Sequence, residues 1–314
     1  QRPAWVNAMR QAGLPESQVQ DIARRIEDHY VDWQEATFPG LLGNVIAGRI
    51  ANRFDLTGSN YVTDAACASR LSALQIALHE LRSGDSDTVL TGGVDALNDI
   101  LMYMCFSKTP ALSVSGDCRP FSTRADGTML GEGVGMLALR RLDDAERDGN
   151  KIYATIRGLG GASDGKGTAI YSPVPHGQAR ALTRAYEQAG YDPSTVDLVE
   201  AHGTGTKAGD KAEIEGLHMV FGEYASEAPW CAVGSIKAQI GHTKAAAGSA
   251  SLIKAAQALS RKVLPPTIKV EEPADAIKNS PVFYLNTEAR PWISPKKRPR
   301  RAAVSSFGFG GSNF

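Results

Sequence analysis

Cys67 is the side chain of this sequence best placed to act as a nucleophile. It lies in the segment Tyr61–Arg70, just before a run of leucines spaced three and four residues apart, as on one helix face: Leu71, Leu74, Leu78 and Leu81. Gly84 is typical of a helix end. Cys67 is therefore expected at the amino end of a helix, where free N–H groups and the helix dipole favour a thiolate. Most single cysteines are simply small buried residues, and for Cys67 alone that interpretation would be preferred.

Two histidine motifs change that preference. His202 follows a predicted strand and precedes a Gly/Thr-rich turn in Glu200–Asp210, and His242 precedes a helix in Gly234–Gly248. Ligands bind at strand ends in α/β sheets, and an imidazole there can donate to a developing oxyanion. A structural histidine fits the first motif equally well. Lys237, five residues before His242, would on its own be interpreted as a solvated surface lysine. The other histidines are expected at the surface or in packing: His29, His79, His176 and His218.

One thiol and two loop histidines indicate a thiol acyl-transfer site. A papain-like protease also uses cysteine and histidine, but it needs one histidine and an orienting Asn or Asp. Two histidines directed at one thioester suit another task. They can hold the carbonyl oxygen of a second acyl group while it loses CO2.

The composition narrows the class of protein. The 314 residues carry 34 basic and 34 acidic side chains, so neither nucleic acid nor an acidic membrane surface is an expected partner. Four cysteines without a CxxC pair predict neither a disulfide framework nor a zinc or other metal site. No apolar run approaches the roughly 20 residues of a membrane span, and no secretory signal is visible. A reducing, cytoplasmic location is expected.

Alternating strands and helices predict an α/β architecture. Residues 1–35 are expected to be polar helix, and 38–54 a Gly-punctuated loop leading into a helix. Further helices are expected at 71–83, from Asp143 onward, and at 178–189, 211–220 and 245–259. Strands are expected at 88–94, 134–142, 152–159, 196–201, 231–236, 282–287 and 302–306. A break near residue 150 predicts two similar halves, 1–150 with the cysteine and 151–314 with both histidines.

The sequence resembles the β-ketoacyl synthases, the condensing enzymes of fatty acid and polyketide synthesis. Motifs in family order carry the resemblance along nearly the whole chain: Asp64–Ser69, Arg119–Gly127 with Gly131–Gly133, His202–Thr206, Lys237–His242 and Ser305–Asn313. The resemblance implies a five-layered thiolase-like fold and a homodimer. It also implies decarboxylative condensation of acyl and malonyl thioesters carried by phosphopantetheine on an acyl carrier protein domain, with no bound cofactor and no metal.

The resemblance also assigns roles to residues. Cys67 would accept the acyl group, and His202 and His242 would serve decarboxylation, supported by Lys237 and Glu213. Phe309 would be the gate beside the thiol, and its N–H and that of Cys67 would form the oxyanion hole. The acyl and pantetheine groups would contact five further residues: Thr204, Thr206, Phe307, Gly308 and Gly310.

Further phrases resemble the condensing domain of bacterial polyunsaturated fatty acid synthases, and enediyne-type iterative polyketide synthases share some of them. These phrases include Phe38–Val45, Ala47–Asp55 and Met104–Ala111. Two features depart from the family. The chain begins at Gln1 without the family's opening strand, so a piece of a larger multidomain synthase, folding poorly alone, is expected. Arg70 stands where a small residue is usual; it would either lower the pKa of Cys67 or, as preferred, point into solvent.

Three alternatives remain open. A thiolase shares the fold but uses coenzyme A and a second cysteine, and Cys231 lacks the glycine-rich context that such a cysteine needs. A non-catalytic partner, like the chain-length factors, would lack the nucleophile that Cys67 supplies. The chain could also be an inactive interaction fragment.

Overall fold

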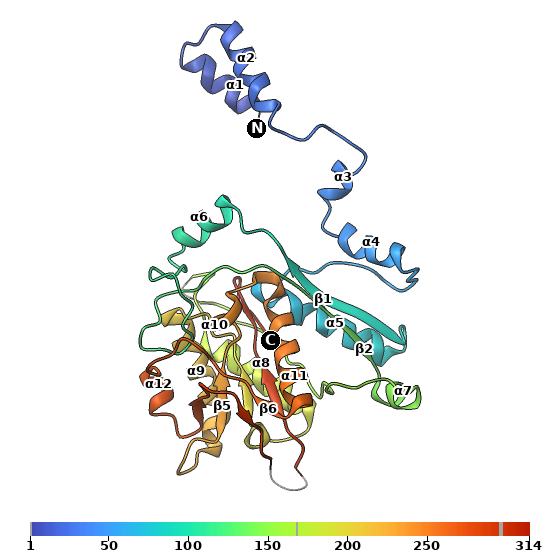
Figure 1. Ribbon diagram of the computed structural model, residues 1–314, viewed down its shortest axis with the longest axis vertical. Helices are drawn as coiled ribbons and strands as arrows, with labels where there is room; N and C mark the ends of the chain where they lie inside the picture. Colours follow the sequence, from blue (N-terminus) through green and yellow to red (C-terminus); the bar gives the residue numbers. More distant parts are fainter. Residues whose placement is uncertain (1, 168, 295–297) are drawn as a thin grey trace. The chain divides into compact units, whose positions relative to one another are not determined.

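The computed structural model describes residues 2–167, 169–294 and 298–314. The chain divides into two compact units, Gln1–Val62 and Thr63–Phe314, which are described separately (Figure 1). All the predicted catalytic residues belong to the second unit. The predicted division near residue 150 remains a prediction.

The first unit is helical, as expected. It contains α1 (Arg2–Gln11), α2 (Glu16–Glu27), the short α3 (Thr37–Gly40) and α4 (Val45–Arg53). Helices α1 and α2 pack together and bury Val19 and Ala23 of α2. The many polar residues of this segment predicted largely exposed helices. In the structure, α1 buries no residue and the other residues of α2 are not buried.

The second unit is built around a parallel four-stranded sheet. Its strand order is β7 (Phe283–Leu285), β5 (Cys231–Gly234), β4 (Leu198–Glu200) and β9 (Ala302–Val304). Side chains alternate between the two faces. Val199 and Val233 belong to one apolar cluster with residues of α8 (Pro175–Ala189) and α9 (Lys207–Phe221), whereas Leu198 and Ala232 belong to another that includes Ala258 of α11 (Ala247–Arg261). Helices therefore cover both faces of the sheet.

A second sheet lies on the far side of α11. Strands β1 (Thr88–Asp95) and β2 (Gly133–Arg140) pair antiparallel, with Thr88 opposite Arg140 and Asp95 opposite Gly133. Helix α5 (Ser69–Ser83) packs on β1, and α11 contacts β1, β2 and α5. Figure 1 shows α5 and α11 beside the long β1–β2 ribbon. Gly84 adopts a left-handed conformation after α5, which confirms the predicted helix stop.

Shorter elements complete the second unit. They are η1 (Ala66–Ala68), α6 (Ile100–Lys108), α7 (Leu142–Arg147), β3 (Ala162–Ser163), η2 (Pro193–Thr195), η3 (Gly222–Tyr224), α10 (Lys237–Ile240), η4 (Lys244–Ala246), β6 (Val263–Leu264), α12 (Asp275–Lys278), β8 (Arg290–Pro291), β10 (Phe307–Gly308) and β11 (Ser312–Asn313). Strands β10, β11 and β3 form a small sheet at the carboxyl end. No described helix is long and apolar enough to cross a membrane.

The strand predicted at 152–159 is wrong. This segment has no strand structure and runs along α8 instead. A Cβ on Gly158 would lie 2.2 Å from the carbonyl oxygen of Ala185, and Leu159 N–H donates to Gln188 Oε1 at 2.7 Å. The apolar alternation of the segment predicted a strand, but its glycines allow close contact with a helix backbone. The other predicted strands and helices are present, with ends displaced by a few residues.

Candidate active site

Cys67 lies in the single turn η1, directly before α5. The preceding residue, Ala66, has a left-handed backbone with φ of 49°, which residues other than glycine rarely adopt. Two side chains hold this turn: Asp64 Oδ1 accepts from Ala66 N–H at 2.8 Å, and Ser69 Oγ accepts from Ala65 N–H at 2.9 Å. The predicted position of the cysteine at a helix start is confirmed.

The carboxyl-terminal Gly-rich segment lies directly against this turn. Ser306 Oγ donates to the carbonyl oxygen of Cys67 at 2.7 Å. A Cβ on Gly308 would lie 2.1 Å from the carbonyl oxygen of Ala65, so only glycine allows this approach. The backbone N–H groups of Phe309 and of Cys67 itself lie near the Cys67 thiol and act to lower its pKa. These two N–H groups are those that the resemblance assigns to the oxyanion hole, and that role remains a prediction.

The pKa of Cys67 moves opposite to the expectation from its helix position. Burial raises the pKa of the thiol, and the charge of Lys237 and the two N–H donors oppose this only in part. Asp95 raises the thiol pKa further. The expectation of a lowered pKa was wrong because the helix-start argument ignored the cost of placing a thiolate in a buried site.

Both predicted histidines lie together, with ring centroids 5.5 Å apart and ring planes at 83°. His202 Nδ1 accepts from Phe307 N–H at 3.3 Å, and His242 Nδ1 accepts from Lys244 N–H at 3.0 Å. Each Nδ1 is thus an acceptor, and each neutral ring carries its proton on Nε2. Burial and the charge of Lys237 lower both histidine pKa values well below the usual range. The pair can therefore supply two neutral N–H donors at physiological pH.

Two carboxylates in the first half of α9 hold the His202 loop. The two oxygens of Glu213 accept from His202 N–H and Gly203 N–H, both at 2.7 Å. Asp210 accepts from Gly205 N–H at 3.0 Å and from Phe121 N–H at 2.7 Å. Burial raises the pKa of each carboxyl to about 7. Asp210 was not singled out from the sequence, although its position three residues before Glu213 on a helix was the available signal.

Lys237 is buried and not solvated. Its Nζ donates to the carbonyl oxygen of His202. Burial lowers the pKa of Lys237, while the charges of Glu213, Cys67 and Glu200 oppose that shift. The charge of Lys237 therefore interacts both with Cys67 and with Glu213, the carboxylate that holds the His202 loop.

The predicted pantetheine contacts have visible structural roles. Thr206 caps α9 by accepting from Gly209 N–H at 3.2 Å, and its Oγ1 lies 2.9 Å from Thr204 Oγ1. The carbonyl oxygen of Thr204 accepts from Cys118, a buried cysteine that the sequence did not single out. Burial raises the pKa of Cys118 to about 11. Gly310 N–H donates to the carbonyl oxygen of Ile170 at 3.1 Å.

The preferred expectation for Arg70 is wrong. Its side chain is fully buried, and Nη1 donates to Thr91 Oγ1 at 3.4 Å. A Cβ on Gly248 of α11 would lie 3.1 Å from the Arg70 Cβ, so α5 and α11 pack closely here. Burial lowers the pKa of Arg70 to about 10. The helix pattern could not show that this position faces β1 and α11.

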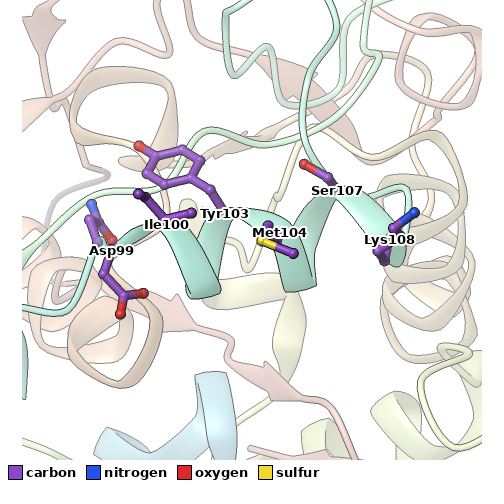
Figure 2. A pocket seen from close by; sticks show the side chains of 7 residues that line it. Asp99, Ile100, Tyr103, Met104, Ser107 and Lys108 are labelled. Carbon is purple, nitrogen blue, oxygen red and sulfur yellow. The ribbon is translucent and has the colours of Figure 1, made fainter. Parts of the chain in front are cut away.

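Helix α6 presents apolar side chains near the predicted gate. Phe106 stacks on Phe309 with ring centroids 6.4 Å apart, whereas Phe309 itself is half exposed. An open hollow of about 520 Å³ is lined by side chains of α6 and the residues just before it, among them Tyr103 and Met104 (Figure 2). None of the predicted catalytic residues lines this hollow. Among the described residues, no cluster of His, Cys, Asp and Glu could hold a metal ion.

Two family models match most of the chain. Residues 7–145 match the family model "Beta-ketoacyl synthase, N-terminal domain", and residues 153–271 match "Beta-ketoacyl synthase, C-terminal domain". The chain is 46% identical to one component of the polyunsaturated fatty acid synthase of Thraustochytrium, over 98% of its own length and 11% of that protein. It is 39% identical to a pikromycin polyketide synthase component of Streptomyces venezuelae, over 93% of the chain and 8% of that protein.

A solved structure has the same fold. The ketosynthase from module 6 of the bacillaene synthase of Bacillus subtilis superimposes with a TM-score of 0.83 at 39% identity. The match covers 86% of this chain and 48% of that one. This chain thus spans about half of the solved ketosynthase chain and a small part of each large synthase.

Proposed function

This chain belongs to the β-ketoacyl synthase family, and from that membership and the site geometry we propose that it catalyses decarboxylative condensation of an acyl group with a malonyl group. The observation that supports this most strongly is a pair of neutral histidines with ring centroids 5.5 Å apart, together with a buried cysteine whose thiol has the N–H groups of Cys67 and Phe309 close to it. A hydrolase of the papain type has no need of the second imidazole.

The first step is acyl transfer to Cys67. The Cys67 sulfur attacks the carbonyl carbon of an acyl thioester, the bond to the carrier sulfur breaks, and the released phosphopantetheine thiol takes the proton. The N–H groups of Cys67 and Phe309 stabilise the tetrahedral oxyanion between these events. The positive charge of Lys237 favours the thiolate form of the cysteine against its burial.

The second step is loss of CO2 from a malonyl thioester. The electrons of the breaking carbon–carboxylate bond move toward the thioester carbonyl, whose oxygen becomes an enolate. His202 Nε2–H and His242 Nε2–H donate to that oxygen. Neutral imidazoles suit this role, because an imidazolium could give up its proton to the enolate and end the reaction without condensation.

The third step forms the new carbon–carbon bond. The enolate carbon attacks the carbonyl carbon of acyl-Cys67, and the same two N–H groups hold the new oxyanion. The Cys67 sulfur then leaves and recovers a proton. The product is a β-ketoacyl thioester on the carrier, so the activity is that of a 3-oxoacyl-carrier-protein synthase.

The proposed partners are an acyl carrier protein domain bearing phosphopantetheine and a second copy of this chain. The outward face of β1 and β2 supports a homodimer, since Leu90, Val94, Val134 and Met136 are exposed there. The relatives are multidomain fatty acid and polyketide synthases, and the 46% identity supports a place in polyunsaturated fatty acid synthesis. A cytoplasmic location remains a prediction.

The thiolase alternative has little support. Cys231 lies in β5 within the sheet core, and burial raises its pKa well above the usual range. Cys118, the cysteine nearer the histidine loop, hydrogen-bonds to a backbone carbonyl.

Condensation is tested by incubating the protein with acyl-carrier and malonyl-carrier thioesters and detecting the β-ketoacyl product and CO2. A non-catalytic partner or an inactive fragment would give neither product. A thiolase would instead condense acetyl-coenzyme A without releasing CO2.

A further inference from the structure

Lys244 is a second buried lysine beside the site, and the catalytic steps above do not use it. Its three N–H donors meet three oxygens, two from the end of β1 and the residues just after it and one from the segment around Gly131. Nζ lies 3.1 Å from Asp95 Oδ1 at the end of β1, donates to Asn98 Oδ1 at 2.6 Å, and donates to the carbonyl oxygen of Gly131 at 3.0 Å. Both members of the ion pair are largely buried, with side-chain exposures of 8% for Lys244 and 16% for Asp95. The lysine therefore cross-links three parts of the chain.

The backbone of Lys244 is joined to His242. Lys244 N–H donates to His242 Nδ1, and the residue has a left-handed backbone with φ of 48°. His242 is held from the other side by the segment that Lys244 Nζ contacts, because His242 N–H donates to Met129 O at 2.6 Å and Gly131 N–H donates to His242 O at 3.0 Å. The backbone of Lys244 thus binds His242 directly, and its side chain binds the segment that holds the His242 backbone.

We propose that Lys244 is a positioning residue that, through its ion pair with Asp95, fixes the His242 imidazole for the decarboxylation step. The ion pair holds the left-handed turn at Lys244 against the end of β1. The Lys244 N–H therefore keeps a fixed orientation toward His242 Nδ1, and this hydrogen bond selects the His242 tautomer. Without the ion pair, that turn would relax, and His242 Nε2–H would no longer be held in one orientation. The inference rests on the proposed function for its effect on CO2 release.

The same pair connects the cysteine and histidine electrostatically. Asp95 raises the pKa of Cys67, and Lys244 contributes to the lowered pKa of His242. The other charge facing both groups is Lys237, which lowers the pKa of each. Removing one member of the ion pair should therefore leave an uncompensated charge that shifts the pKa of Cys67.

The first test is the rate of Cys67 alkylation by iodoacetamide against pH, followed on the Cys67 peptide by mass spectrometry. Lys244→Met should move the midpoint to higher pH and Asp95→Asn to lower pH, each by on the order of half a unit. The double variant should return toward the parent. Lys278→Met, which removes an exposed lysine paired with Glu272, is the matched control and should leave the midpoint unchanged.

The second test is CO2 release from a malonyl-carrier thioester. Lys244→Met should lower kcat by on the order of 10- to 100-fold and leave KM nearly unchanged, because only the direction of a donor is lost. Histidine 15N spectra should show a second His242 tautomer in this variant. If Lys244→Met does not fold, Asp95→Asn keeps the side-chain shape and still tests the pair.

Alkylation requires no substrate, so the two proposals can fail separately. A parent protein that releases no CO2 overturns the proposed function, whereas the midpoints and the tautomer still decide the role of the ion pair. Midpoints of both single variants within about 0.1 unit of the parent, with a single His242 tautomer in Lys244→Met, would overturn the inference.

Discussion

Glu213→Gln tests how the His202 loop is held. Each oxygen of Glu213 accepts one backbone N–H, from His202 and from Gly203, at 2.7 Å. Glutamine keeps one oxygen and directs an NH2 group at the other N–H, so one buried donor loses its acceptor. An unsatisfied buried hydrogen-bonding group costs about 1–3 kcal/mol. A shift of the loop by about 1 Å would lower the decarboxylation rate on the order of 100-fold.

The pH dependence of stability gives an independent measurement. Burial raises the pKa of Glu213 to about 7, whereas an exposed glutamate titrates near ~4.3. Between those two values the folded chain holds a proton that the unfolded chain has lost. The contribution of Glu213 to the free energy of unfolding therefore falls as pH rises through this window. Glu213→Gln removes this contribution, so the stability of the variant relative to the parent should rise between pH 4.5 and 7.

Two assays check these expectations. Denaturant melts across the pH range compare the slopes of stability, and CO2 release compares the decarboxylation rates. Cys67 acylation serves as the internal control, because the acyl-transfer step does not require the His202 donor. Equal pH slopes in parent and variant, or an unchanged rate of CO2 release, would refute the assigned role of Glu213.

Three further predictions use the same assays. Cys67→Ala should abolish acylation by an acyl-carrier thioester as mapped by mass spectrometry; continued acylation at any other cysteine would sink the assignment. His202→Ala and His242→Ala should each retain much of the acyl loading but lose CO2 release on the order of 100- to 1,000-fold, and normal CO2 release in either would contradict the donor role. Lys237→Met and Glu213→Gln should lose less free energy of catalysis together than the sum of the single losses, whereas additive losses would show that they act independently.

The residues with local signals could be predicted from the sequence. Cys67 precedes a helix pattern, His202 and His242 follow strand-and-turn patterns, and the structure places each of them at such a position. The glycine-rich segment near Phe309 was also apparent, because tight backbone approach requires glycine. The candidate catalytic residues could therefore be predicted largely from short sequence motifs, without knowledge of the fold.

What could not be predicted was burial. Arg70 and Lys237 carry charges that favour the surface, yet the packing of α5 and α11 encloses one and the histidine loops enclose the other. The pKa direction of Cys67 depended on the same missing information. Asp95 and Lys244 lie 149 positions apart in the numbering of the sequence, and only the fold shows that they form a pair.

The buried charges of the site are better explained by positioning than by stability. Raised pKa values show that Glu213 and Asp210 are less stable as carboxylates here than in water. Apolar residues could not replace them, since the N–H groups of the His202 loop would then lack acceptors. The loop cannot move to direct those N–H groups elsewhere, because His202 Nδ1 must stay in place to accept from Phe307 N–H. That hydrogen bond leaves the ring proton on Nε2. The cost in stability is therefore consistent with the proposed role of His202 and His242, in which two neutral imidazoles donate to one oxygen.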